Sequence, residues 1–278
     1  MKPKPYTRVL QYIALGFFIC FLGFPLLWLI TTAFKSPQEL ATINPTLFPT
    51  MPTVDNFVAA MVHNNLGRAL LNSLIVAVAT AVITTVLALP ASYALARNRS
   101  RLRTVTIGWI LVSQVFPFIL IVIPLFIVLK NLGLLNSLQG LVLVYVVWSL
   151  PFTLWMLLGY VSAIPNDLEE AAATDGAGKL ATLVQIIFPL LVPGLVATSM
   201  FAFISAWNEF FFALVVIQTP ELQTAPLLLA RYVGAEGLVQ LGPLAATALI
   251  TTLPGLFIFA VIQRKLISGM MMAGAVKG

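Results

Sequence analysis

Four of the nine acidic residues of the chain lie in one segment, 162–185, together with a single base. Asp167, Glu169 and Glu170 stand in the first turn of a predicted helix, where the helix dipole favours negative charge. Carboxylates in this position can stabilise the helix or bind a partner through their negative charge. Bond-breaking chemistry within a membrane would instead need a nucleophile with its base, or paired carboxylates, and the apolar runs contain neither set.

The acidic segment predicts two short helices at an angle. Pro165 stops the preceding apolar run, Asn166 is the expected N-cap, and Glu169 stands three residues later, as a capping box requires. Gly176 and Gly178 are expected to end this helix. Two interpretations remain open on these residues alone. The helix is either a solvated, well-capped loop or a docking element whose small alanines let a partner approach closely.

A second helix is expected to start near Lys179 and to enter the membrane, with Pro189 and Pro193 bending its first turns. No phosphate-binding Walker A sequence is present, because Gly178-Lys179 is followed by Leu180 and lacks the preceding glycine. ATP hydrolysis must then be supplied by another chain, and we expect no cofactor in this one.

The chain has one histidine, His63, and one cysteine, Cys20. These counts exclude a histidine-based metal or acid–base site within the membrane, a cysteine metal site and an intrachain disulfide. We therefore expect neither a metal centre nor catalytic residues.

Polar residues inside apolar runs are candidates for lining a solute pathway, because polar groups in lipid are costly and usually face a cavity or another helix. Hydroxyl-rich solutes would meet hydrogen-bonding groups and aromatic faces there. The alternative for each candidate is a structural contact, either within the chain or to a partner. The candidates are Gln114, Trp148, Asn208 and Glu209.

The composition identifies the class of protein that must position these residues. Hydrophobic residues make up 60% of the 278 residues and charged residues only 9%, with a mean hydropathy of +1.02. Soluble domains carry about 25% charged residues, and disordered chains combine low hydrophobicity with high charge. The chain is therefore predicted to be an all-α polytopic membrane protein that forms one transmembrane domain, 1–278.

Apolar stretches of about 20 residues, the length needed to cross a bilayer, occur six times. They leave an acidic loop at 162–185 and a C-terminal tail at 263–278. The outer segment 33–67 is long and rich in proline, and we expect it to lie over the extracytoplasmic mouth. A small exposed helix is expected around Leu227 to Tyr232. The predicted spans are 9–32, 69–96, 105–129, 140–161, 186–217 and 243–262.

The basic residues predict the orientation, since cytoplasmic loops carry an excess of Lys and Arg. Eleven lie on the side of the two termini and four on the other, which places both termini in the cytoplasm. Their short clusters between apolar runs suit membrane orientation and contact with lipid rather than nucleic-acid binding. The eleven are Lys2, Lys4, Arg8, Arg97, Arg99, Arg101, Arg103, Lys179, Arg264, Lys265 and Lys277, and the four are Lys35, Arg68, Lys130 and Arg231.

The acidic segment also resembles a known signature. Glu170-Ala171-Ala172, followed by Gly176, Ile186 and Pro189, is similar to the EAA motif of bacterial ABC importer permeases. Two further stretches resemble the second permease subunit of maltose-type carbohydrate transporters. They are 206–210 in the fifth span and the C-terminal residues Gly274, Ala275, Val276, Lys277 and Gly278.

This resemblance implies the fold of a type I ABC importer permease in the bacterial cytoplasmic membrane. It implies a second, related permease in a heterodimer, two ATP-binding subunits that hold ATP and magnesium, and an extracytoplasmic solute-binding protein. In such proteins the EAA loop docks on an ATPase subunit and the C-terminal tail reaches toward the ATPase dimer interface. The docking role is carried over to Glu169, Glu170, Ala171, Ala172, Asp175 and Gly176.

The expected function is that of a translocation subunit, without catalysis of its own, for a disaccharide, an oligosaccharide or a glycosylated polyol. Glycerol phosphate or another polar solute is an alternative substrate. A self-sufficient secondary transporter is a further alternative, but it would be expected to carry ionisable groups in several spans. A membrane-embedded enzyme would need the catalytic groups that the chain lacks.

Overall fold

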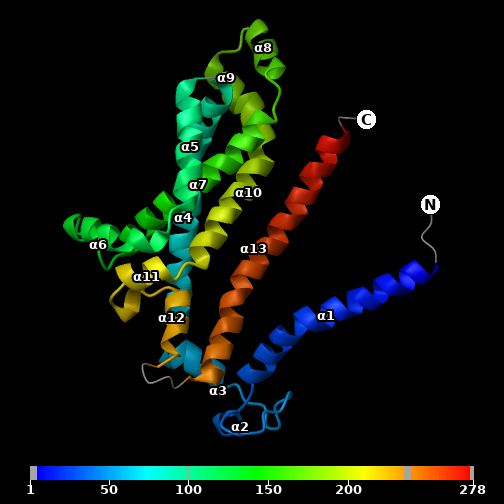
Figure 1. Cartoon of the computed structure of the whole chain (residues 1–278), viewed down its shortest axis with the longest axis vertical. Coiled ribbons are helices and arrows are strands. Elements are labelled where there is room, and N and C mark those ends of the chain that lie inside the picture. The colour runs from blue at the N-terminus through cyan, green and yellow to red at the C-terminus, as the bar shows by residue number, and fades with distance from the viewer. Residues whose placement is uncertain (1–4, 99, 235–238, 276–278) are drawn as a thin grey trace. The chain divides into compact units, whose positions relative to one another are not determined.

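The computed structural model of the protein describes residues 5–98, 100–234 and 239–275 (Figure 1). Within them the regular structure is helical, apart from one antiparallel bridge between Val233 and Val239. The chain forms two units that we describe separately. The first comprises the described residues of 1–67 and 228–253, and the second those of 68–227 and 254–278.

The first unit contains a long apolar helix and a folded outer segment. Its buried cluster joins Ala33 of α1 to Ala245 and Ala246 near the start of α13. Asn56 fixes the chain after α1, because its side-chain amide donates to the carbonyls of Ala33 (2.9 Å) and Lys35 (2.8 Å). The helices of this unit are α1 (Pro5–Ala33), α2 (Pro37–Leu40), α3 (Asp55–Val58), a π-helical turn at Ala59–His63, and the beginning of α13 (Leu241–Ala275).

The second unit contains the predicted cytoplasmic loop and the helices around it. Among these helices α7 and α10 pack along each other. Gly194 permits this approach, since a Cβ atom at that position would lie 2.5 Å from the Cγ atom of Tyr160. The helices are α4 (Leu66–Arg97), α5 (Arg101–Val115), α6 (Val122–Asn131), α7 (Leu138–Ser162), α8 (Asp167–Thr174), α9 (Lys179–Thr182), α10 (Phe188–Trp207) and α11 (Phe211–Val216), with 3-10 turns at Phe118–Leu120 and Pro220–Leu222 and a π-helical turn at Leu183–Ile187.

Five helices among the described residues are long and apolar enough to cross a membrane. The predicted spans 9–32, 69–96 and 140–161 coincide with α1, α4 and α7. The sixth predicted span coincides with the first part of α13, which continues as helix to Ala275 through most of the predicted tail. The five segments are Arg8–Ala33, Leu66–Arg97, Leu138–Ser162, Lys179–Trp207 and Leu241–Ala260.

The predicted span 105–129 is not formed by a single helix. Helix α5 ends at Val115, and Phe116 is extended, with φ −69° and ψ 129°. The physical reason is Pro117, since the ring of a proline disfavours helical backbone in the residue before it. The six-span count therefore stays a prediction, as does the placement of both termini in the cytoplasm.

The predicted fifth span, 186–217, is likewise divided between two helices. Helix α10 ends at Trp207 and a separate helix, α11, begins at Phe211. The small helix expected near Leu227 is present as α12 (Ala225–Arg231), but Ala225, Leu227 and Leu228 are buried, so it is not the exposed helix that we predicted. Its apolar residues explain the burial.

Candidate functional site

Helix α8 and the turn after it form the predicted cytoplasmic loop. The helix ends at Thr174, and Gly176 follows with a φ of +83°, a left-handed conformation that favours glycine. The predicted capping box is wrong. Asn166 has helical backbone angles and makes no side-chain cap, whereas an N-cap residue typically has extended backbone.

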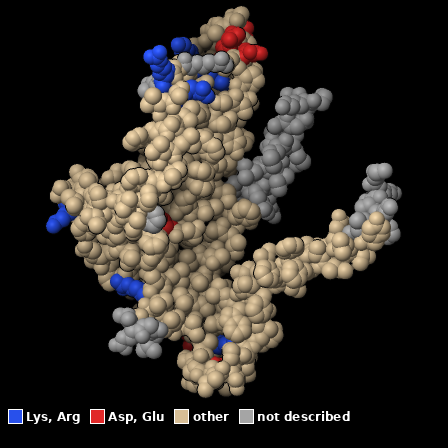
Figure 2. All heavy atoms as spheres, viewed as in Figure 1, with Lys and Arg blue, Asp and Glu red and all other residues tan. Residues whose placement is uncertain are grey.

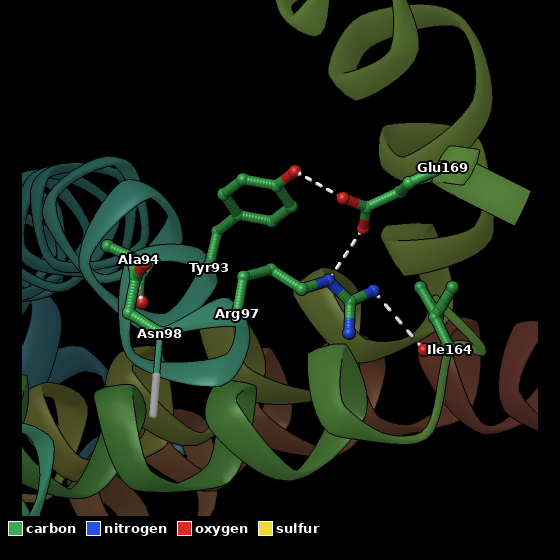
Figure 3. Close-up of polar contacts among 6 residues, drawn as sticks. All are labelled: Tyr93, Ala94, Arg97, Asn98, Ile164 and Glu169. Carbon is green, nitrogen blue, oxygen red and sulfur yellow. Dashed lines mark hydrogen bonds and ion pairs between the residues drawn. The ribbon is translucent and has the colours of Figure 1, made fainter. Parts of the chain in front are cut away.

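Glu169 binds residues of α4 instead of capping its own helix (Figure 3). Arg97 Nε donates to Glu169 Oε1 at 2.6 Å, and the Tyr93 hydroxyl donates to Glu169 Oε2 at 2.8 Å. The second nitrogen of the same guanidinium, Nη2, donates to the carbonyl of Ile164 at 3.2 Å. We call Tyr93, Arg97, Glu169 and the Ile164 carbonyl the Glu169 cluster. It joins the start of α8 and the end of α7 to α4.

The Glu169 cluster is largely shielded from solvent. The side chains of Arg97 and Glu169 are 14% and 21% exposed. Tyr93 and Ile164 also pack against an apolar cluster formed by Val161, Ile187 and Leu191. The acidic loop is thus held to α4 by polar contacts. These contacts lie next to an apolar cluster that packs α4, α7 and α10 together.

The other predicted docking residues divide between an exposed and a buried face. Glu170, Ala171, Asp175 and Gly176 are exposed. Ala172 is buried, with 5% of its surface accessible. In the space-filling view, acidic side chains project at the α8 end of the second unit, next to a group of Lys and Arg (Figure 2). A partner approaching α8 would therefore meet Glu170 and Asp175, while Glu169 is occupied within the chain.

Sequence reasoning missed Tyr93 and Arg97. In the sequence Arg97 is one of the basic residues that predict the orientation, and its partner Glu169 lies 72 residues later. No local pattern connects them. The available signal was the presence of acids and bases in two loops predicted to lie on the same side of the membrane.

Two of the four predicted pathway residues lie at one cavity. Gln114 and Trp148 line a space of about 230 Å³, together with Trp109, Ser113 and Phe212. The Trp148 and Phe212 rings meet edge to face, with centroids 5.7 Å apart. This cavity therefore offers an amide, a hydroxyl and aromatic faces in one place.

The other two pathway candidates, Asn208 and Glu209, do not line this cavity. The Asn208 side chain is exposed and donates to the carbonyl of Ile204 at 2.9 Å. The Glu209 carboxylate accepts from the backbone N–H groups of Phe212 (3.0 Å) and Ala213 (3.3 Å) at the start of α11. These contacts support the structural interpretation of Glu209 and explain where α10 ends and α11 begins.

Of the predicted C-terminal tail residues, Gly274 and Ala275 belong to the backbone of α13. Val276, Lys277 and Gly278 lie outside the described residues.

Long apolar helices and a helical, acidic loop at one end of the second unit define an integral membrane protein of the transport class. The chain belongs to the family of binding-protein-dependent transport system inner membrane components, whose pattern matches residues 85–271. It is therefore an ABC importer permease and a multi-pass protein of the cytoplasmic membrane. The resemblance inferred from the EAA motif is confirmed.

Individual proteins agree with this assignment. A putative ABC transporter permease protein of Streptomyces antibioticus is 53% identical over 229 residues, which cover 82% of this chain and 99% of that protein. A diacetylchitobiose uptake system permease protein of Streptomyces coelicolor is 39% identical over the full length of both chains. A chain in the crystal structure of a bacterial ABC transporter involved in alginate import has a TM-score of 0.79 at 20% identity, covering 95% of this chain and 99% of that one, and supports the fold.

Proposed function

We propose that the chain is the translocation subunit of an ATP-driven importer for a sugar or sugar-like solute. In this proposal helices α8 and α9 dock on a separate ATP-hydrolysing subunit, and the chain performs no bond chemistry. The single observation that supports the docking role best is that α8 has one face packed against the protein and one face exposed. Glu169 and Ala172 face inward to the protein's own helices, while Glu170 and Asp175 remain exposed for a partner.

The Glu169 cluster provides a route by which motion at α8 would reach the membrane helices. An ATPase dimer that closes on ATP would displace α8. Because Glu169 is bound to Arg97 and Tyr93, and because Ile187 and Leu191 are packed beneath the loop, α4, α7 and α10 would move with it. Rigid-body motion of this type is a known route between alternative transporter states. We propose that it alternates the pathway between inward-facing and outward-facing forms.

Within the second unit, the cavity lined by Gln114 and Trp148 is the best candidate for part of the solute pathway. Sugars present hydroxyl groups and apolar C–H faces, which match an amide or hydroxyl and an aromatic ring respectively. Gln114, Ser113 and Trp148 supply these groups at one place. The sugar assignment is also supported by the diacetylchitobiose uptake named for the Streptomyces coelicolor relative. The particular sugar would then be selected mainly by an external solute-binding protein.

We further propose that the chain pairs with a second, related permease and serves two ATP-binding subunits. Family membership supports this assembly, because the family is described as a component of binding-protein-dependent transport systems. Most of the large apolar residues of α1 are exposed in the isolated chain, including Phe17, Phe21 and Phe24, as expected of a helix surrounded by lipid or by a partner.

The proposal is tested by charge reversal at the exposed acid of the EAA motif. Glu170→Lys should leave membrane insertion unchanged but reduce both copurification of the ATP-hydrolysing subunit and transport-coupled ATP hydrolysis in proteoliposomes. The matched control is Glu221→Lys, which reverses an exposed acid on the side predicted to be extracytoplasmic. Normal coupled hydrolysis by Glu170→Lys, or an equal loss in the control, would contradict the docking role.

A further inference from the structure

A second polar site lies beside the Glu169 cluster and has no role in the proposed function. It is a cavity of about 980 Å³ at the predicted cytoplasmic end of the second unit, between the end of α4, the start of α5 and the α7–α8 connection. The residues that supply its polar lining include Arg97, Ser100, Arg101, Arg103, Thr104 and Asn166.

The lining of this cavity is cationic. Among the described residues, three arginines and no acidic side chain line it. Arg97 is already bound to Glu169, so Arg101 and Arg103 carry the available charge. Arg103 Nε is buried and has no hydrogen-bond partner among the described residues. A buried N–H donor without an acceptor is costly, and a turn of this guanidinium toward the cavity would let a bound anion accept from it.

The start of α5 adds further groups suited to an anion. Ser100 caps the helix by accepting a hydrogen bond from the backbone N–H of Arg103 at 3.3 Å. Residues of the cap and first turn of this 15-residue helix line the cavity, so its positive dipole end lies at the cavity. The hydroxyls of Ser100 and Thr104 can donate to the same ligand. Guanidinium, hydroxyl and helix N-terminus together are the groups that bind phosphate.

The position of the cavity indicates which phosphate compound would occupy it. The cavity lies at the ends of the apolar helices α4 and α7, which is the level of lipid headgroups. Below it on α5, Val105, Trp109 and Val112 are 67%, 74% and 63% exposed and recur at helical spacing along one face. A ligand with an anionic head and apolar chains would contact both regions at once.

We propose that this cavity binds the phosphate headgroup of an anionic phospholipid of the cytoplasmic leaflet, with Arg101 and Arg103 as its main contacts and the acyl chains along the exposed face of α5. Arg97 and Asn166 also line the cavity, so bound lipid would adjoin the Glu169 cluster and the start of α8. The headgroup would then hold the acidic loop against the membrane surface.

The test is retention of lipid by the transporter purified through a tag on this chain. The protein is equilibrated with phosphatidylcholine vesicles that contain phosphatidylglycerol, and the retained lipids are then identified by native mass spectrometry. We expect phosphatidylglycerol to be retained in preference to phosphatidylcholine. The double variant Arg101→Gln, Arg103→Gln should lower this preference about 30-fold, as expected for two basic residues near an anionic surface.

Two controls make the outcomes distinct. Arg231→Gln removes an exposed cation far from the cavity in sequence and should leave retention unchanged, and Arg101→Lys with Arg103→Lys should retain most of the preference. Equal retention of the two lipids by the wild-type transporter, which needs no variant, would overturn the proposal. Displacement of phosphatidylglycerol by inorganic phosphate at millimolar concentration would also overturn it, in favour of a soluble anion.

Discussion

The Glu169 cluster makes a quantitative prediction for Arg97→Gln. Removing one partner of a fully buried ion pair costs roughly 3–5 kcal/mol, whereas an exposed pair contributes about 0–1 kcal/mol. Arg97 and Glu169 are 14% and 21% exposed and their atoms lie 2.6 Å apart, so the pair falls between these limits. We expect local stability at the start of α8 to fall by about 2 kcal/mol, which is about 30-fold in the opening equilibrium.

Hydrogen exchange measures this change directly, because backbone protection reports local opening. In the assembled transporter, amides of α8 in Arg97→Gln should exchange about 30-fold faster than in the wild type, while those in the middle of α7 stay unchanged. The matched control is Lys130→Gln, which removes an exposed cation at the end of α6, outside the proposed docking helices. Coupled ATP hydrolysis should fall in Arg97→Gln and not in the control.

A double-mutant cycle with Glu169→Gln separates this pair from other effects. The destabilisation of the double variant should be smaller than the sum of the two single variants by about 1 kcal/mol or more, as found for residues in direct contact. Wild-type exchange rates in α8 of Arg97→Gln, or strict additivity in the cycle, would refute the reasoning that the pair holds the loop.

Three other predictions follow from the same structure. Gly194→Val should lower the thermal stability of the transporter, because a Cβ at 194 would lie 2.5 Å from the Tyr160 ring. Gly159→Val, inside α7, should not, because a Cβ there meets nothing within 4 Å, and equal melting temperatures of the two variants would contradict this packing. Gln114→Leu, of similar size, should raise the solute concentration needed for half-maximal uptake while leaving basal ATP hydrolysis unchanged, and unaltered uptake would remove Gln114 from the pathway. The hydrogen bond from Thr46 lowers the pKa of the Glu39 carboxyl, so its contribution to the outer segment is present above the ordinary pKa of about 4.3 and is lost as pH falls through the lowered value. After correction for the intrinsic pH dependence of exchange, protection of the Thr50 amide should fall below that pH in the wild type but not in Glu39→Gln.

The long apolar runs were predictable because their signal is strong and local. The runs at 9–32, 69–96 and 140–161 became α1, α4 and α7, and the acidic segment became a short helix ended at Gly176. The two interrupted spans were harder to predict. Pro117 is compatible with either a kinked or a broken helix, and only the extended backbone at Phe116 decides for a break.

The errors at the site have a common cause, which is competition between local and distant partners. Glu169 stands at the right distance from Asn166 for a capping box, but Arg97 and Tyr93 provide a charged and a hydroxyl donor from another helix. In the sequence Glu209 is an acid inside an apolar run. In the structure its carboxylate accepts from a backbone N–H at the start of α11, a helix whose beginning the apolar run does not reveal. Sequence spacing predicts hydrogen-bond partners within one helix but not partners on another helix.

The central claim is that the α8 loop of this chain contacts a separate ATP-hydrolysing subunit, and site-directed crosslinking tests it most directly. The single cysteine is first removed as Cys20→Ser, and Ala173→Cys then places one thiol on the exposed surface of α8. A thiol-to-amine crosslinker is applied in membranes, and mass spectrometry identifies the attached peptides. Our account predicts peptides of an ATP-binding subunit attached at position 173 and none at the exposed control position in Gln218→Cys. A chain that remains uncrosslinked at position 173, purifies alone and moves solute without ATP would contradict it.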